Sequence, residues 1–343
     1  MKADIFKILE KEYIQKLFEE KKNFYFPSFK NKKISKIEIE RTSPDWAQRT
    51  CLARYKIFFS DGSFKIIRGT TKVDGSKKWS YKIMKHLYES GFSKGRFLVP
   101  RPLDYVEETG LFIYEEAQGE PLSLILEKNQ YSPKFSQEIA KFLFKIHSLK
   151  NIKFKKKALI FDLEDYLKTY KRIKKIFPRL VNFFPLKKIH LIQRLEEESS
   201  FIHADFYTGN LIIQENKIIL IDFDKMGFGP ILYDLASFCS CFEFPKSIWP
   251  VSLAKEDIKK YQHVFLKSYT EMVGWNLLKL KYILNKYLAK VFLNALNYYT
   301  GLAHEGWPVL RKEEKKAYFI RIRGLLEKIN QYLKKYESFI HRF

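Results

Sequence analysis

The sequence predicts an α+β fold with two lobes, a small N-terminal lobe built on an antiparallel sheet and a larger, mainly helical C-terminal lobe. Two observations support this: β-branched and aromatic residues are dense in the first third, and long helical patterns fill the last third. At 343 residues the chain is long enough for both lobes. The pattern changes near residues 115–121, and we place the lobes at residues 1–116 and 117–343.

The predicted N-terminal lobe starts with a leading helix, because residues 1–22 alternate apolar and charged side chains at helical spacing. Residues 33–43 and 51–69 predict three antiparallel strands, with Asp61-Gly62 as a hairpin turn. Residues 77–91 predict a helix that stops at Gly91. Two further strands are expected around a turn at Gly110.

The predicted C-terminal lobe begins after Gly119-Glu120-Pro121. Residues 132–150 carry apolar side chains on one helical face, and residues 277–299 and 321–340 continue as long helical patterns. Between these helices lies "FIHADFYTGNLIIQENKIILIDFD", residues 201–224, which predicts a strand pair. We therefore expect one hairpin within a helical surrounding.

Composition excludes several classes of protein. The net charge of +24 favours anionic partners such as nucleotides, phosphorylated metabolites, nucleic acid or an anionic membrane face. No Arg-rich cluster concentrates that charge, so a general lysine-rich bias fits better than a dedicated polyanion site. Three cysteines exclude a disulfide framework, and zinc-site spacing is absent. Without a signal-peptide or membrane-spanning run, we expect a cytoplasmic protein.

Polar residues at the ends of the predicted hairpin indicate chemistry. Pairing residues 211–213 with 218–221 would bring Asn210 and Asp222 to the same end of two strands. Oxygen ligands without thiolates suit Mg²⁺, which is held by few carboxylates together with substrate phosphates. Asp205, five residues before Asn210, could reach the same space as a general base.

This segment resembles the catalytic core of the aminoglycoside phosphotransferase and choline kinase superfamily, relatives of protein kinases. The similar features are "HADFYTGN" for its His-Gly-Asp loop ending in Asn, "LIDFD" for its metal-binding strand end and "GPILYDLASF" for its Asp-Leu-Ala helix start. Their order and spacing extend through "SQEIAKFLFKIHSL" and, more loosely, across residues 35–310. The resemblance implies a bilobal, protein-kinase-like fold.

The resemblance also implies roles in phosphoryl transfer, a reaction dominated by alignment and charge neutralisation. Asp205 would accept or orient the proton of an attacking hydroxyl. Asn210 and Asp222 would hold Mg²⁺ on the phosphates of ATP, with GTP as an open alternative. His203 would brace the loop, and Asp234 would tie the loop backbone to the next helix.

The N-terminal lobe would cover the nucleotide. Strand alternation puts Ile66 and Arg68 on one face, and Arg68 stands where the family has its phosphate-binding cation, with Lys72 as the substitute. The adenine would rest on the hinge between the lobes. Its expected residues are Ile113 to Ala117, with Glu115, Glu116 and Ala117 as the contacts.

Two further positions concern the same site. The helix that usually offers a Glu to the phosphate-binding cation has Ser80 there, so the expected ion pair is absent or comes from elsewhere. Asp224 would assist the metal or the substrate.

The acceptor is less determined: a sugar, an amino alcohol or an aminoglycoside-like molecule would each fit, through its hydroxyl. Carboxylates and aromatic residues of the C-terminal lobe are the candidate lining, although core packing is the favoured explanation of the aromatics. These are Asp224, Glu243, Glu305, Tyr298, Tyr299 and Trp307. The alternative is a degenerate kinase-fold module that binds a polyanion, such as nucleic acid or an anionic surface, through its basic face.

Overall fold

The computed structural model describes residues 4–44, 48–128, 130–150, 152, 154–188, 190–193, 199–245, 247–248, 253–308 and 310–340. The chain divides into two compact units, Met1–Glu120 with Leu211–Asp224, and Pro121–Asn210 with Lys225–Phe343. The first is built on an antiparallel sheet and the second is mainly helical, as the predicted fold class has them. The lobe bounds differ from the expected ones, because residues 211–224 belong to the first unit and not to the helical lobe.

The main sheet of the first unit has five strands in the order β1-β2-β3-β6-β5, all antiparallel to their neighbours. Its strands are the predicted ones, with the β2–β3 turn at Gly62, whose φ is +83°. Their bounds are β1 Ile34–Arg41, β2 Thr50–Phe59, β3 Phe64–Lys72, β5 Pro102–Val106 and β6 Leu111–Glu115.

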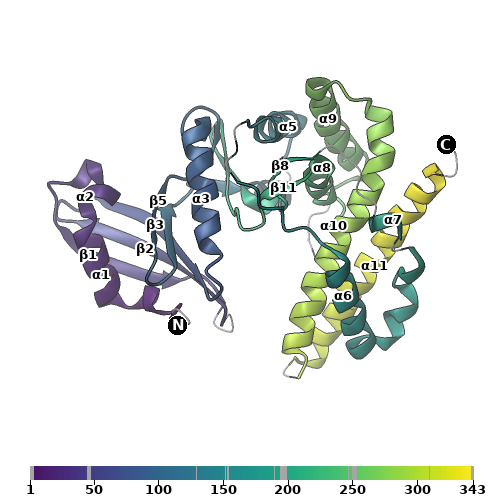
Figure 1. The fold of residues 1–343 in the computed structure, drawn as a ribbon, viewed down its shortest axis with the longest axis horizontal. Helices are drawn as coiled ribbons and strands as arrows, with labels where there is room; N and C mark the ends of the chain where they lie inside the picture. Colours follow the sequence, from purple (N-terminus) through teal and green to yellow (C-terminus); the bar gives the residue numbers. More distant parts are fainter. Residues whose placement is uncertain are drawn as a thin grey trace. The chain divides into compact units, whose positions relative to one another are not determined.

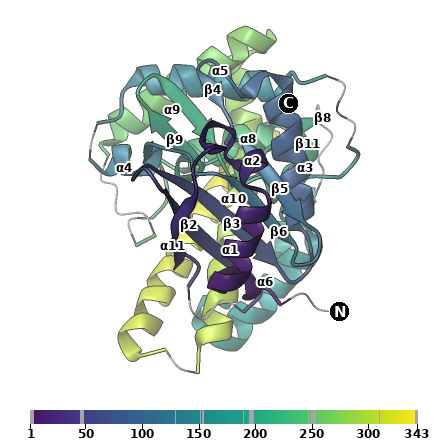
Figure 2. The same cartoon turned by 90° about the vertical axis from the view of Figure 1, so that its left-hand side faces the viewer.

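Helices cover both faces of this sheet. Helix α1 (Lys11–Glu20) lies across one face, as Figure 2 shows, and its buried Phe18 packs edge-on against Tyr25 and against Tyr55 of β2. Helix α3 (Lys77–Leu87) contacts β3, β5 and β6, and its Tyr81 meets Phe112. Phe112 alternates with Leu111 and Ile113 of the α1-side core, so α3 lies on the opposite face.

Short helical segments complete the helical part of the first unit. They are η1 Lys7–Leu9, α2 Lys22–Tyr25, η2 Pro27–Phe29 and the π-turn η3 Tyr88–Phe92. The predicted stop at Gly91 falls within η3, where its φ is +92°. Helix α3 therefore ends in the left-handed conformation that glycine adopts readily.

The predicted hairpin is confirmed in both strands and register. Strand β9 (Leu211–Gln214) pairs antiparallel with β10 (Lys217–Leu220), with Ile213 opposite Ile218. The full order is β4-β10-β9-β7, where β4 is Phe97–Leu98 and β7 is Glu120–Pro121. At Gly119 a Cβ would lie 2.2 Å from the Ile213 carbonyl oxygen, so this crossing requires glycine.

The second unit is a helical assembly around α8 (Ile231–Ser240), which is buried along its whole length. Helix α10 (Leu277–Gly306) packs on α8 and pairs with α11 (Lys312–Ile340), as Figure 1 shows, while α5 (Pro133–His147) packs on α9 (Lys255–Val273). The remaining segments are α4 Leu122–Glu127, α6 Leu163–Ile176, η4 Pro178–Phe183, η5 Leu186–Lys188, α7 His190–Gln193 and η6 Thr208–Asn210.

One strand pair of the second unit was not predicted. Strand β8 (Ser199–Ile202) pairs antiparallel with β11 (Gly227–Pro230). The sequence of β11, Gly-Phe-Gly-Pro, carries no strand signal, because glycine and proline disfavour strands. No helix in the described part of the chain is long and apolar enough to span a membrane.

Candidate active site

The loop that carries His203 and Asp205 is fastened to α8 through its backbone. Asp234, fully buried in the first turn of α8, accepts hydrogen bonds from the backbone amides of His203 at 2.7 Å and Ala204 at 2.8 Å. Hydrogen bonds to a carboxylate are charge-assisted and strong. Asp234 thus makes the backbone contact that the sequence analysis expected of it.

A buried histidine, which the sequence analysis missed, contacts the carboxylate of Asp234. His147 at the end of α5 places Nε2 3.2 Å from Oδ2 of Asp234 and Nδ1 2.7 Å from the hydroxyl of Tyr269. The three side chains come from α8, α5 and α9, so the network ties the loop to three helices. The only sequence signal was a histidine at the end of an apolar helical stripe.

Ala204 explains why this loop commonly has glycine. Its φ is +63°, in the left-handed region that costs a residue with a Cβ about 1–2 kcal/mol. The hydrogen bond from the Ala204 amide to Asp234 holds that conformation. His203 is buried and lies edge-on to Phe206 with ring centroids 6.1 Å apart, which fits the expected bracing role.

Asp205 is partly exposed and is paired with a lysine. Its Oδ1 lies 3.0 Å from Nζ of Lys225, and the two side chains are 27% and 35% exposed. Its backbone carbonyl accepts a hydrogen bond from Nδ2 of Asn210 at 3.0 Å. The amide nitrogen of Asn210 therefore fastens the loop, and its oxygen is the atom suited to a metal.

The strand end after β10 carries Asp222 and Asp224 in the first unit. Asp222 has a φ of +64°, a left-handed turn at the end of the strand. Asp224 accepts hydrogen bonds from Lys77 Nζ at 2.6 Å and from Ser80 Oγ at 2.6 Å. Burial alone would raise the pKa of Asp224. The charge of Lys77, the hydrogen bonds from Lys77 and Ser80 and the charge of Lys72 together outweigh burial and leave this pKa below its ordinary value.

Arg68, the expected phosphate-binding cation, has a carboxylate partner just after the end of β6. Its NH2 lies 2.6 Å from Oε1 of Glu116, and Arg54 binds the same carboxylate at 2.9 Å. The ion pair that Ser80 cannot supply therefore comes from the hinge. Lys72 pairs with Asp74 at 3.3 Å and lowers the pKa of Asp224 through its charge, so it lies toward the strand end.

The expected hinge follows β6. Glu115 donates its backbone amide to the carbonyl of Arg101 at 3.0 Å, and the Glu116 amide points to the Ile66 carbonyl at 3.4 Å. Ala117 is half-buried beyond these bonds. The segment is an extended backbone beside β3, as an adenine-binding edge requires.

Most of the candidate acceptor residues take part in packing. Trp307 lies edge-on to Phe177 with centroids 5.0 Å apart, and Arg321 lies over the ring of Tyr299. Tyr298 is 61% exposed. Of the set, Glu243 alone lines a pocket described below.

The oxygen donors suit the expected metal better than any metal that prefers nitrogen or sulfur. The described residues contain no group of three or more His, Cys, Asp or Glu side chains that could hold an ion by themselves. A site with one carboxylate and one amide oxygen depends on substrate phosphates and water for the other ligands, which is the usual arrangement for Mg²⁺.

Comparison with known proteins concerns the family and the fold. A model of the phosphotransferase enzyme family matches residues 63–269, more than half of the chain. No curated protein matches the chain.

Solved structures share the fold at low identity. An amicoumacin kinase has a TM-score of 0.58 at 17% identity, with 91% of this chain and 93% of that chain covered. An ethanolamine kinase of Plasmodium vivax gives 0.59 at 16%, covering 94% and 89%. A choline kinase of Cryptosporidium parvum gives 0.63 at 13%, covering 97% of each chain. None of these matches supports nucleic-acid binding.

Proposed function

We propose, because the chain belongs to the phosphotransferase enzyme family, that it transfers the γ-phosphate of ATP to a hydroxyl of a small molecule. The observation that carries the proposal is the fastening of the Asp205 loop by Asp234 and Asn210. Such a loop presents a carboxylate in a fixed position, and position is what phosphoryl transfer needs most.

Asp205 orients the acceptor hydroxyl and takes up its proton as the new bond to phosphorus forms. Lys225, 3.0 Å from that carboxylate, holds it in one orientation and keeps a positive charge beside the transferred phosphoryl group. The exposed fraction of 27% leaves Asp205 open to a substrate. His203 and Asp234 act behind it as structural supports.

Asn210 and Asp222 are the proposed metal ligands, through one amide oxygen and one carboxylate. Bound there, Mg²⁺ would neutralise charge on the β- and γ-phosphates. The fit rests on the chemistry of the donors and on the use of the Asn210 nitrogen within the loop, which directs its oxygen elsewhere.

The nucleotide would be held by the first unit. Arg68 contacts the α- and β-phosphates. Before ATP binds, the ion pair with Glu116 holds the guanidinium of Arg68 in position. The adenine rests on the backbone of residues 113–117 beside Ile66. Lys72 is the second candidate for the phosphate-binding cation, and its charge acts on Asp224 at the strand end.

Calorimetry and a transfer screen test the proposal. We expect the purified chain to bind ATP only with Mg²⁺ present, with GTP titrated alongside. Radiolabelled phosphate from γ-labelled ATP should then appear on one pool of sugars, amino alcohols or aminoglycosides. The Asp205→Ala variant should bind nucleotide equally and transfer none. Binding without any transfer that depends on Asp205 contradicts the proposal.

A further inference from the structure

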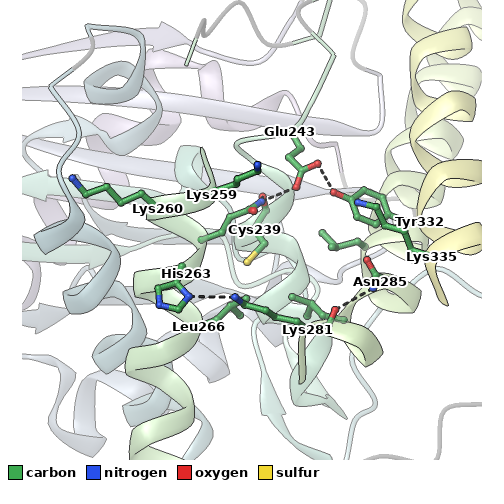
Figure 3. Close-up of a pocket in the computed structure, with 13 residues that line it drawn as sticks. Cys239, Glu243, Lys259, Lys260, His263, Leu266, Lys281, Asn285, Tyr332 and Lys335 are labelled. Atoms are coloured by element: carbon green, nitrogen blue, oxygen red, sulfur yellow. Dashed lines mark hydrogen bonds between the residues drawn. The ribbon is translucent and has the colours of Figure 1, made fainter. Parts of the chain in front are cut away.

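A second pocket lies within the helical unit. Figure 3 shows this hollow of about 530 Å³, a size typical of small-molecule sites, between α8, α9, α10 and α11. Its lining includes Cys239 and Glu243 near α8, Lys259 and His263 of α9, Lys281 of α10 and Lys335 of α11.

This pocket carries an excess of positive charge. Lys259, Lys260, Lys281 and Lys335 line it, and within the described residues none of the four forms an ion pair with a carboxylate. Among the described residues of the lining, Glu243 is the only acidic one. An anion entering the pocket would therefore meet four lysines that are not ion-paired with any carboxylate of the described residues.

Glu243 does not offset these lysines, because it already has its own partners. Its carboxylate accepts hydrogen bonds from Gln262 Nε2 at 2.8 Å, from Lys328 Nζ at 3.1 Å and from the hydroxyl of Tyr332. Burial would raise the pKa of Glu243, but these partners outweigh it and the pKa lies below the ordinary value. Glu243 is thus a partly exposed anchor of the pocket wall.

The lysine of α10 has an unusual neighbour. Lys281 Nζ lies 3.2 Å from Nδ1 of His263, a contact drawn in Figure 3. A neutral His263 can accept this hydrogen bond at Nδ1, but an imidazole does not neutralise the positive charge of the lysine as a carboxylate would. A bound anion between α9 and α10 would be attracted by both side chains.

The pocket opens on a different side of α8 from the catalytic loop. Asp234 and Cys241 face the loop, the first through His203 and the second through Thr208. At 100° per residue, Cys239 lies about 140° around the helix from Asp234. Glu243 follows the end of α8, on the pocket side. The pocket is therefore separate from the Asp205 side of the unit.

We infer that this pocket binds a small organic polyphosphate, a ligand with two or more linked phosphates. The four lysines are exposed side chains around the hollow, and together they exceed what one phosphate needs. A half-open hollow of about 530 Å³ suits a small molecule rather than a duplex. A neighbouring hollow of about 460 Å³ shares Asn285 and Lys335 and is walled by the stacked rings of Tyr282 and Phe339. These two rings provide an apolar surface for the organic part of the ligand.

Titration with tripolyphosphate tests this inference on the full chain, in EDTA and at physiological salt. We expect the double variant Lys281→Gln/Lys335→Gln to raise the Kd at least tenfold. The control Lys312→Gln/Lys316→Gln removes the same charge from exposed positions of α11 and should change the Kd less than twofold. Equal weakening in both variants, or no binding by the wild type, overturns the inference.

Lysine footprinting provides a second measurement that does not depend on a variant folding. Tripolyphosphate should slow acetylation of Lys281 and Lys335 severalfold and leave Lys312 and Lys316 unchanged. Uniform protection of all four, or none, overturns the inference. Both measurements read binding without turnover, so their outcome is independent of whether the chain transfers phosphate.

Discussion

The loop at residues 203–210 and the strand end at residues 222–224 carry consecutive parts of one sequence motif, yet they are held by different forces. The loop is fastened by backbone amides to Asp234, a carboxylate with no exposed surface. The strand end is fastened by side chains, with Asp224 bound to Lys77 and Ser80. The first anchor is shielded from solvent, whereas the second depends on an ion pair that pH can break.

Removing the buried anchor should have the largest effect. We expect Asp234→Ala to lower the free energy of unfolding by about 3–5 kcal/mol, because it leaves two buried amides and His147 without their acceptor. Urea unfolding followed by circular dichroism measures this. The Asp234→Asn variant keeps one acceptor oxygen, so its free energy of unfolding should lie between those of the wild type and the alanine variant. A loss below about 1 kcal/mol for the alanine variant means that the amides find other partners.

Lys225, in the segment after the strand end, acts on the loop and should affect rate more than stability. We expect Lys225→Met to lower kcat about 10- to 100-fold without changing the Kd for Mg·ATP, because Asp205 loses its ammonium partner. Lys225→Arg keeps the charge and should retain most activity. An unchanged kcat in the methionine variant would show that Lys225 takes no part in the proposed reaction.

The ion pair of the strand end should show a pH signature. Since the folded pKa of Asp224 is lowered, its stabilisation is present above about pH 4 and is lost as pH falls through the folded pKa. We expect Lys77→Met to cost about 1–2 kcal/mol at pH 7, a cost that shrinks below pH 4. Thermal unfolding across pH 2–7 measures this difference.

The neighbouring lysine provides a matched control. Lys78 pairs with Glu107, but both side chains are exposed, so Lys78→Met should cost much less stability than Lys77→Met at every pH. Equal losses for Lys77→Met and Lys78→Met would show that burial does not strengthen the Asp224 pair.

The smallest effect concerns the loop backbone. Ala204→Gly relieves the left-handed conformation but gives up a buried methyl group, so we expect a change within about 1 kcal/mol. Ala204→Val should be clearly destabilising, because a β-branched residue resists this conformation. Melting temperatures compare the three proteins. A valine variant as stable as the wild type means that the loop relaxes.

Local patterns explain what the sequence could predict. The register of β9 with β10 follows from alternation and a two-residue turn, and both are visible in residues 211–220. The contact of Asp234 with the loop followed from the order of the motifs. The core strands and long helices likewise depend on periodicity alone.

Side-chain partners far apart in the chain could not be predicted. The separation is 87 residues for His147 and Asp234, 147 for Lys77 and Asp224, and 62 for Arg54 and Glu116. No periodicity links such positions, because their contact results from the packing of whole helices and strands. Ser80 is a further example. The sequence showed that the expected glutamate is missing at this position, but it did not show that Ser80 binds the carboxylate of Asp224.

The most direct test of the central claim compares wild type with Asp205→Asn in a phosphate-transfer assay at saturating Mg·ATP. The account predicts that the variant keeps the Kd for Mg·ATP within about twofold and loses at least about a thousandfold in kcat, because the loop retains its shape and only the proton acceptor is gone. A variant that transfers phosphate at the wild-type rate would contradict the assignment of Asp205 as the group on which the reaction depends.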